Sequence, residues 1–174
     1  IDVLEMRKKL KKIGAKKTHK SIKLVRSVFD LCDSKVRGFA RVRKEEDGVR
    51  MTSKIYNNPD FPDEYEVKIN EDFEKGREFL KSLNLKEKAY QESYREKWSH
   101  PKAHEITFDL LPGLPPYMEL DCDSEENLNY LIKILNLDES KKRYGAFDRT
   151  YNEYYDIPKD VINNKTPSLT FKNS

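Results

Sequence analysis

Several short segments alternate apolar and charged residues, and this pattern restricts the fold more than any other feature of the sequence. Successive side chains of a β-strand point to opposite faces of a sheet, so each such segment has one apolar face and one charged face. The segments that we predict as strands are 22–31, 37–44, 48–56, 64–70, 88–99, 103–110 and 116–123. Asp47-Gly48 is the residue pair of a tight hairpin between two of them.

Amphipathic segments precede, divide and follow these strands. Residues 3–13 form an apolar stripe after Asp2, which can cap a helix, and residues 71–83 form a second such stripe. A third helix is expected after Ser124, and a short fourth helix over 148–155. The order helix, four strands, helix, three strands, helix predicts an α+β fold.

The charges are sorted from strand to strand. Basic residues dominate some charged faces: Arg41 with Arg43, Arg50 with Lys54, and Arg95 with Lys97. Acidic residues dominate others: Glu64 with Glu66, Glu105 with Asp109, and Glu119 with Asp121. An open sheet with its charges in water is the commoner arrangement. A closed or nearly closed antiparallel barrel of about eight strands, with charges inside and helices packed outside, is the alternative. Periodicity alone leaves both open.

Composition limits the classes of ligand. Charged residues make up 37% of the chain, but 34 basic and 31 acidic residues are interleaved, so a nucleic-acid partner is not expected. No apolar run approaches the ~20 residues of a membrane-spanning helix. Cys32 and Cys122 lack metal-ligand spacing, and we interpret both as buried free thiols in a reducing, cytoplasmic compartment. A homodimer is left open.

The inside of such a barrel would suit a triphosphate. Arginine presents a planar fork that matches phosphate oxygens, and lysine adds a point charge. We predict that Arg41, Arg43, Lys54 and Arg95 form the phosphate cradle. Glu119 and Asp121 lie two residues apart on one strand face and can share Mg²⁺ or Mn²⁺, since hard cations take oxygen ligands.

The chain resembles the CYTH superfamily of triphosphate tunnel enzymes, which includes class IV adenylyl cyclases, thiamine triphosphatases and inorganic triphosphatases. The matching segments are FD at 29–30, ARVRKEEDGVRMTSK at 40–54, EYEVKI at 64–69, SYREKW at 93–98, EITFDLLPGLPPYMELD at 105–121 and YNEYYDIP at 151–158.

The resemblance implies a single tunnel domain over residues 1–174. Its pattern implies that the phosphates are held by Arg41, Arg43, Lys54 and Arg95, of which Arg43, Lys54 and Arg95 also serve catalysis. It implies that Glu119 and Asp121 bind the metal, and that Glu64 and Glu66 either bind metal or order the basic residues.

The sequence departs from the family pattern at three places. The family's opening strand carries Glu-x-Glu-x-Lys ahead of the first helix; no such strand precedes the helix that starts after Asp2, so we expect it upstream of Ile1. The last acid pair is Glu-x-Asp instead of Glu-x-Glu, and Ser93 stands where many members have lysine.

Three functions are compatible with this pattern. The first is metal-dependent hydrolysis of a nucleoside, thiamine or inorganic triphosphate. The second is a class IV adenylyl cyclase, in which the ribose 3′-hydroxyl replaces water as the nucleophile. The third is a non-catalytic binder of nucleotides or polyphosphate.

Overall fold

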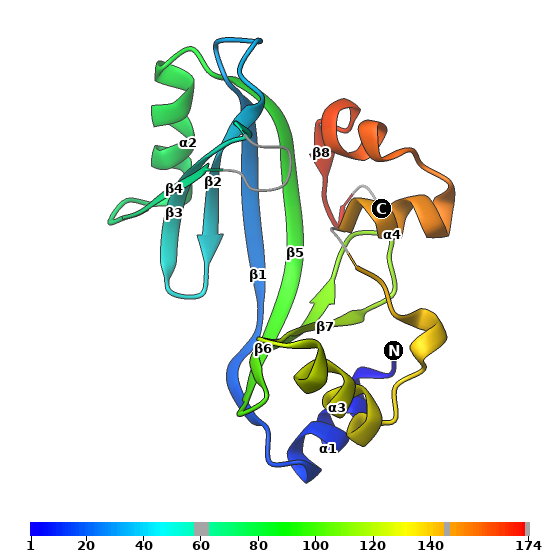
Figure 1. Cartoon of the computed structure of the whole chain (residues 1–174). Helices are drawn as coiled ribbons and strands as arrows, with labels where there is room; N and C mark the ends of the chain where they lie inside the picture. The colour runs from blue at the N-terminus through cyan, green and yellow to red at the C-terminus, as the bar shows by residue number, and fades with distance from the viewer. Residues whose placement is uncertain (58–62, 145–146, 173–174) are drawn as a thin grey trace.

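The computed structural model describes residues 1–57, 63–144 and 147–172. The chain builds one mainly antiparallel sheet with helices on its faces (Figure 1). The elements are α1 (Val3–Lys12), β1 (Lys16–Asp30), β2 (Gly38–Glu45), β3 (Gly48–Ile55), β4 (Asp63–Ile69), α2 (Phe73–Ser82), β5 (Lys86–His100), β6 (Ala103–Leu110), β7 (Tyr117–Asp121), α3 (Glu125–Leu135), η1 (Glu139–Lys141), α4 (Phe147–Tyr155), η2 (Val161–Lys165) and β8 (Ser168–Leu169). The predicted α+β class is confirmed.

The two longest strands form the centre of the sheet. The strand order is β4-β3-β2-β1-β5-β6-β7, and β8 adds to β5 in parallel. β1 and β5 have 15 residues each and pair over nearly their whole length, with register shifts that mark bulges. β1 begins six residues before the predicted start, because the polar residues after Ala15 pair with the end of β5. Tertiary pairing decides this boundary against weak local β-propensity.

One face of the sheet is apolar and carries three helices. α2 packs on β2 and β3 through a core that includes Phe29, Val42 and Leu80. At the other end of the sheet, α1 and α3 lie together over a core that includes Trp98 and Ile106 (Figure 1). The predicted helices therefore cover the apolar faces of the strands, as expected.

Local sequence signals set the ends of these helices. The Asp2 and Asp72 side chains cap α1 and α2, and Ser124 caps α3 by accepting from the backbone N–H of Asn127. Gly76 lets α2 approach the sheet closely, because a Cβ there would lie 2.8 Å from Cγ2 of Val42.

The C-terminal elements lie beside β5, on the opposite side from α2 (Figure 1). α4 and η2 pack against the turn after β6 through a small core of Leu111, Leu114, Tyr151 and Ile162. Tyr151 also donates its hydroxyl to the carbonyl oxygen of Pro112. These contacts place the first residue of α4, Phe147, over the charged side of the sheet.

A barrel closed by hydrogen bonds is not what the structure shows. β4 and β7 are the two ends of the strand order, and no pairing joins them within the described parts of the chain. The prediction is a closed or nearly closed barrel of about eight strands. The eight strands are present, but closure of the barrel is not confirmed, because no hydrogen bonding among the described residues joins β4 to β7. The expected strand upstream of Ile1 lies outside this sequence and stays a prediction.

The cysteine prediction is half wrong. Cys32 follows β1 and is exposed, because the strand ends at Asp30 and the thiol lies in the connection beyond it. Cys122 follows β7 and is half-buried, and both cysteines are free. No helix in the described residues is long and apolar enough to cross a bilayer.

Candidate functional site

Strand register places the sorted charges on one continuous surface, which we call the charged face. From β4 to β1, Glu66 lies opposite Thr52, Thr52 opposite Arg41, and Arg43 opposite Arg26. Beyond the β1–β5 pair, Arg95 lies opposite Asp109 and Thr107 opposite Glu119. The face includes Arg26, Arg41, Arg43, Arg50, Lys54, Glu64, Glu66, Arg95, Lys97, Glu105, Asp109, Glu119 and Asp121.

The part of this face on β2, β3 and β4, which we call the basic half, carries five basic side chains: Arg41, Arg43, Arg50, Lys54 and Lys68. Arg43 donates to Glu66 at 2.9 Å, and Lys54 lies 2.9 Å from Glu64. Arg41 lies more loosely between the same carboxylates, at 3.7 Å from Glu64 and 3.9 Å from Glu66. Glu64 and Glu66 thus form ion pairs with the basic side chains, and their roles toward a ligand or metal stay predictions.

The part on β5, β6 and β7, which we call the acidic half, is organised around one guanidinium. Arg95 makes a two-point contact with Asp109, at 2.6 and 3.0 Å, and donates to Glu119 at 2.9 Å. Glu105 lies 3.9 Å from the same arginine. The predicted phosphate ligand Arg95 is therefore engaged with three carboxylates.

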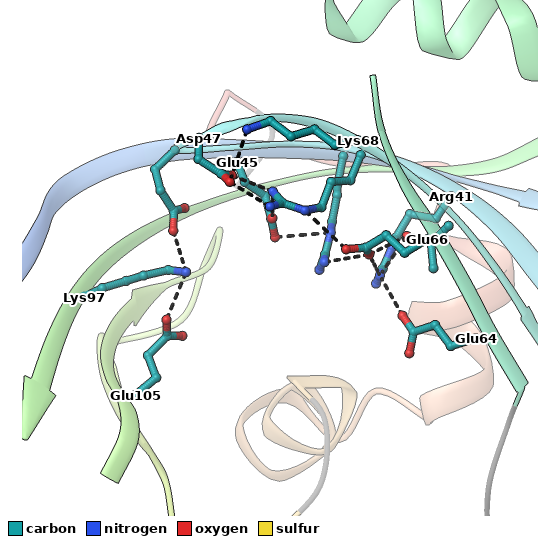
Figure 2. Close-up of polar contacts among 12 residues, drawn as sticks. Arg41, Glu45, Asp47, Glu64, Glu66, Lys68, Lys97 and Glu105 are labelled. Carbon is teal, nitrogen blue, oxygen red and sulfur yellow. Dashed lines mark hydrogen bonds and ion pairs between the residues drawn. The ribbon is translucent and has the colours of Figure 1, made fainter. Parts of the chain in front are cut away.

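An ion-paired lysine connects the two halves. Lys97 on β5 contacts Glu105 at 3.0 Å and Glu46, in the β2–β3 turn, at 2.5 Å. Figure 2 shows these side chains meeting on one side of the bent sheet, with Lys97 and Glu105 approaching from one half and Arg41, Glu64 and Glu66 from the other. Burial opposes the charge of Lys97, but the two carboxylates raise its pKa above the ordinary value.

A cavity of about 240 Å³ lies between the halves. Its walls include Arg26, Arg43, Arg95 and Glu119, with Tyr117 and Phe147 as aromatic neighbours. Cations and carboxylates therefore line the same space, in which a ligand would meet both.

The pKa shifts of the charged side chains differ between the acidic half and the basic half. Burial, followed by repulsion from Asp109, raises the pKa of Glu119 above its usual value. Burial and the neighbouring Arg43 lower the pKa of Arg41. The carboxylates on one side would thus gain from an added cation, and the guanidinium groups on the other from an added anion.

Two buried donors on the basic half have no acceptor. The Nε atoms of Arg41 and Arg43 are buried and donate no hydrogen bond to any described residue. Arg43 Nε lies 3.1 Å from Glu45 Oε1, but the geometry is not that of a hydrogen bond. Buried polar atoms without partners are uncommon in folded proteins, and they often mark a place where a ligand or water binds.

The predicted site residues are brought together only in part. Arg41, Arg43 and Lys54 form one cluster, and Arg95 and Glu119 form another. Asp121 shares the charged face but is exposed at its edge. Glu64 and Glu66 lie on β4 and are not gathered with Glu119 and Asp121, which lie on β7 at the other edge of the sheet.

The carboxylates of the acidic half are the candidate ligands for a cation. Carboxylate oxygens are the ligands that Mg²⁺ and Mn²⁺ prefer. Burial, followed by repulsion from Asp109, raises the pKa of Glu119, and a nearby cation would oppose both effects. Within the described ranges, no group of three or more His, Cys, Asp or Glu side chains is close enough to hold an ion. The carboxylate oxygens suit a hard cation, but ion pairs with Arg95 set the positions of the Asp109 and Glu119 side chains.

Sequence reasoning missed three side chains that line the cavity: Arg26, Tyr117 and Phe147. Arg26 lies between Leu24 and Val28 on its strand face, so no charge alternation signalled it. Tyr117 precedes the acid pair by two residues on the same strand, a spacing that could have revealed it. Phe147 enters from α4, and only the tertiary fold brings it there.

Comparisons with known proteins support the fold. No protein-family model matches the chain, and no curated protein is significantly similar in sequence. A protein from Vibrio parahaemolyticus described as a "putative adenylate cyclase" aligns with a TM-score of 0.63 and 12% identity, over 85% of this chain and 90% of that one. A conserved hypothetical protein from Pyrococcus furiosus aligns with a TM-score of 0.60 and 19% identity, over 83% and 93%.

A third similar structure is a protein from Pyrococcus horikoshii, with a TM-score of 0.59, 19% identity, and coverage of 83% of this chain and 92% of that one. Identities this low show a shared α+β fold and nothing finer.

Proposed function

We propose that this chain is a CYTH-type domain that binds a triphosphate on its charged face and acts on it with the help of a divalent cation. The observation that carries the proposal is the pair of buried donors, Arg41 Nε and Arg43 Nε, that make no hydrogen bond within the described residues. Arg43 lines a cavity whose far wall is acidic. A triphosphate has phosphate oxygens for the donors and can share a cation with the acids. The similarity to the Vibrio protein described as an adenylate cyclase agrees with this class.

The basic half would bind and orient the phosphates. Arg41, Arg43 and Lys54 converge there, and Glu64 and Glu66 fix their positions before any ligand arrives. Phosphoryl transfer requires mainly positioning and neutralisation of charge. Side chains that are already held in place reorganise little during the reaction, so their electrostatic effect is larger.

The acidic half would hold Mg²⁺ or Mn²⁺. Glu119 and Asp121 are the proposed ligands, with Glu105 as their neighbour on the same face. A bound ion would supply neutralisation of phosphate charge and polarisation of a phosphorus–oxygen bond. Arg95 pairs with Asp109 and Glu119 in the absence of the ion and lines the cavity from the same side.

Hydrolysis is the first candidate reaction, since it requires only water as the nucleophile and no pocket for a nucleoside. Cyclisation of ATP is the second candidate, and the Vibrio protein favours it. A binder without catalysis is the third, supported by Ser93, a side chain without formal charge at a position that lines the cavity.

Phosphorus NMR separates these reactions in one assay. The protein would be incubated with ATP, thiamine triphosphate or tripolyphosphate, each with Mg²⁺ or Mn²⁺. Orthophosphate with a diphosphate product indicates hydrolysis, and pyrophosphate with a cyclic monophosphate indicates a cyclase. Tight binding without turnover would leave the binder, and the absence of both binding and turnover would refute the proposed function.

A further inference from the structure

Arg26, in the middle of β1, has an unusual set of contacts. Its Nε donates to the side-chain oxygen of Gln91 at 2.6 Å. The guanidinium carbon lies 4.7 Å from the centre of the Phe147 ring, a distance typical of a cation–π contact. The two terminal nitrogens donate no hydrogen bond to the residues that the structure describes, so their N–H groups remain available at the cavity wall.

No carboxylate among the described residues forms an ion pair with this arginine. Every other arginine on the charged face has an acidic group within 4.0 Å, as Arg41, Arg43, Arg50 and Arg95 do. Within residues 1–57, 63–144 and 147–172, none lies that close to Arg26. Asp109 and Glu119 line the same cavity, but both are engaged by Arg95.

The surroundings of Arg26 add positive charge. Burial, together with the nearby charges of Arg41, Arg43 and Arg95 and opposed by Tyr117, lowers the pKa of Arg26 to about 10. The charged form is therefore less favourable in the folded protein than in the unfolded chain. A site built this way gains more from an anion than a site whose arginines are already paired.

Two contacts hold the guanidinium of Arg26. Its carbon lies over the Phe147 ring, and its Nε donates to Gln91. The remaining N–H groups of an arginine held in this way can donate in pairs to anionic oxygens. Two residues from different elements, β5 and α4, thus direct one side chain at the cavity.

We propose that Arg26 binds an anionic oxygen of the ligand directly through its terminal N–H groups, with Phe147 and Gln91 holding the guanidinium in position. The proposal rests on the proposed function, because it names a further phosphate-binding residue of the same face. Arg26 lies between the basic half and the acidic half, so it would contact a phosphate group that spans them.

The test is a calorimetric titration of tripolyphosphate with Mg²⁺ into the wild type and into Arg26→Met, which keeps an apolar stem against Phe147. We expect at least about tenfold weaker binding, the effect of losing a hydrogen bond to a charged group. Arg26→Lys keeps the charge without the planar fork, so its affinity for tripolyphosphate should lie between those of the wild type and Arg26→Met. Lys20→Met removes an exposed charge from the same strand and serves as the matched control.

A second variant tests the positioning role of Phe147. Phe147→Leu should weaken binding by about threefold, the typical size of an exposed cation–π contact. Adding Phe147→Leu to Arg26→Met should weaken binding no further, because Phe147 acts through Arg26.

Thermal unfolding without ligand tests whether Arg26 is mainly structural. The melting temperature of Arg26→Met should equal or exceed that of the wild type, because the variant removes a partly buried cation that has no ion pair with a described residue. A purely structural arginine would instead lower the melting temperature when it is replaced.

The outcomes separate the two proposals. If the wild type binds tripolyphosphate and Arg26→Met binds it within about threefold as well, the role of Arg26 is wrong and the proposed function stands. Equal losses of affinity in Arg26→Met and Lys20→Met would show that only net charge matters, and this would also overturn the role of Arg26. If the wild type binds no triphosphate, the proposed function fails, and the role of Arg26 fails with it.

Discussion

The basic half and the acidic half of the charged face are built from the same residue types but balanced differently. On β2–β4, Glu64 and Glu66 each pair with more than one cation, and two guanidinium nitrogens donate no hydrogen bond to a described residue. On β5–β7, Arg95 serves three carboxylates, and the pKa of Glu119 is raised. The basic half therefore keeps donors without hydrogen bonds, and the acidic half keeps a buried carboxylate beside a like charge. A phosphate chain with a cation would supply a partner for each.

The largest effect on stability is expected at the centre of the acidic half. Arg95→Met removes the partner of Asp109, whose side chain is 3% exposed and would retain only the Thr107 hydroxyl. Leaving a buried carboxylate unpaired should cost about 3 kcal/mol of unfolding free energy. Denaturant unfolding measures this loss. Asp109→Leu in the same background should recover part of it, and a loss below about 1 kcal/mol would mean that the half is not organised around Arg95.

The second expected effect is on turnover and involves one residue from each half. Arg43→Ala and Glu119→Ala should each lower turnover of the substrate by at least about 100-fold, a typical loss for one electrostatic contact to a transition state. The exposed Lys75 on α2, changed to alanine, is the control on the opposite face. Wild-type rates in both variants would show that the two halves do not form one site.

The third prediction concerns pH and the acidic half. A cation binds Glu119 in its deprotonated form, and the folded-state pKa is raised above the usual value of 4.5. Binding of Mn²⁺ should therefore weaken on acidification earlier than for an ordinary glutamate, by about tenfold per pH unit below that pKa. Electron paramagnetic resonance of free Mn²⁺ follows this loss.

Glu119→Gln provides the comparison for the Mn²⁺ titration. It should bind Mn²⁺ weakly at all pH values and should lose this part of the pH dependence. Because a raised pKa favours folding only while the group is protonated, the substitution should also raise the unfolding free energy at neutral pH. A pH profile of Mn²⁺ binding identical to that of the wild type would remove Glu119 from the cation site.

The smallest effect is expected where the halves meet. Lys97 and Glu46 form a half-buried ion pair between β5 and the β2–β3 turn. A double-mutant cycle of Lys97→Met and Glu46→Gln should give a coupling energy of about 1 kcal/mol. A coupling energy near zero would mean that backbone pairing alone sets the distance between the halves.

The features that the sequence predicted best are those that follow from the alternation of side chains along a strand. The shared faces of Arg41 with Arg43, and of Glu119 with Asp121, follow from alternation, and the observed register places all four on the same surface. The helices over the apolar face follow from their own stripes. These features are local, so a single sequence contains them.

Features that depend on non-local pairing were not predictable. The pairing of residues 16–21 with the end of β5, and the open edges at β4 and β7, depend on which strands meet. The salt bridges that engage Arg95 come from β6 and β7 together. Arg26 has apolar neighbours on its strand face, so alternation of charge did not identify it. Its partner Phe147 lies on a helix more than a hundred residues later in the chain.

Titration of tripolyphosphate with Mg²⁺ into the wild type and into an Arg41→Ala, Arg43→Ala double variant tests the central claim most directly. Calorimetry should detect saturable binding to the wild type and at least about 100-fold weaker binding to the variant, since two charge-assisted contacts are lost. The melting temperature of the wild type should rise in parallel, with about 2.7 kcal/mol of added stability at 100 times the dissociation constant. Equal binding by both proteins, or none by the wild type with any triphosphate, would contradict a triphosphate site on the charged face.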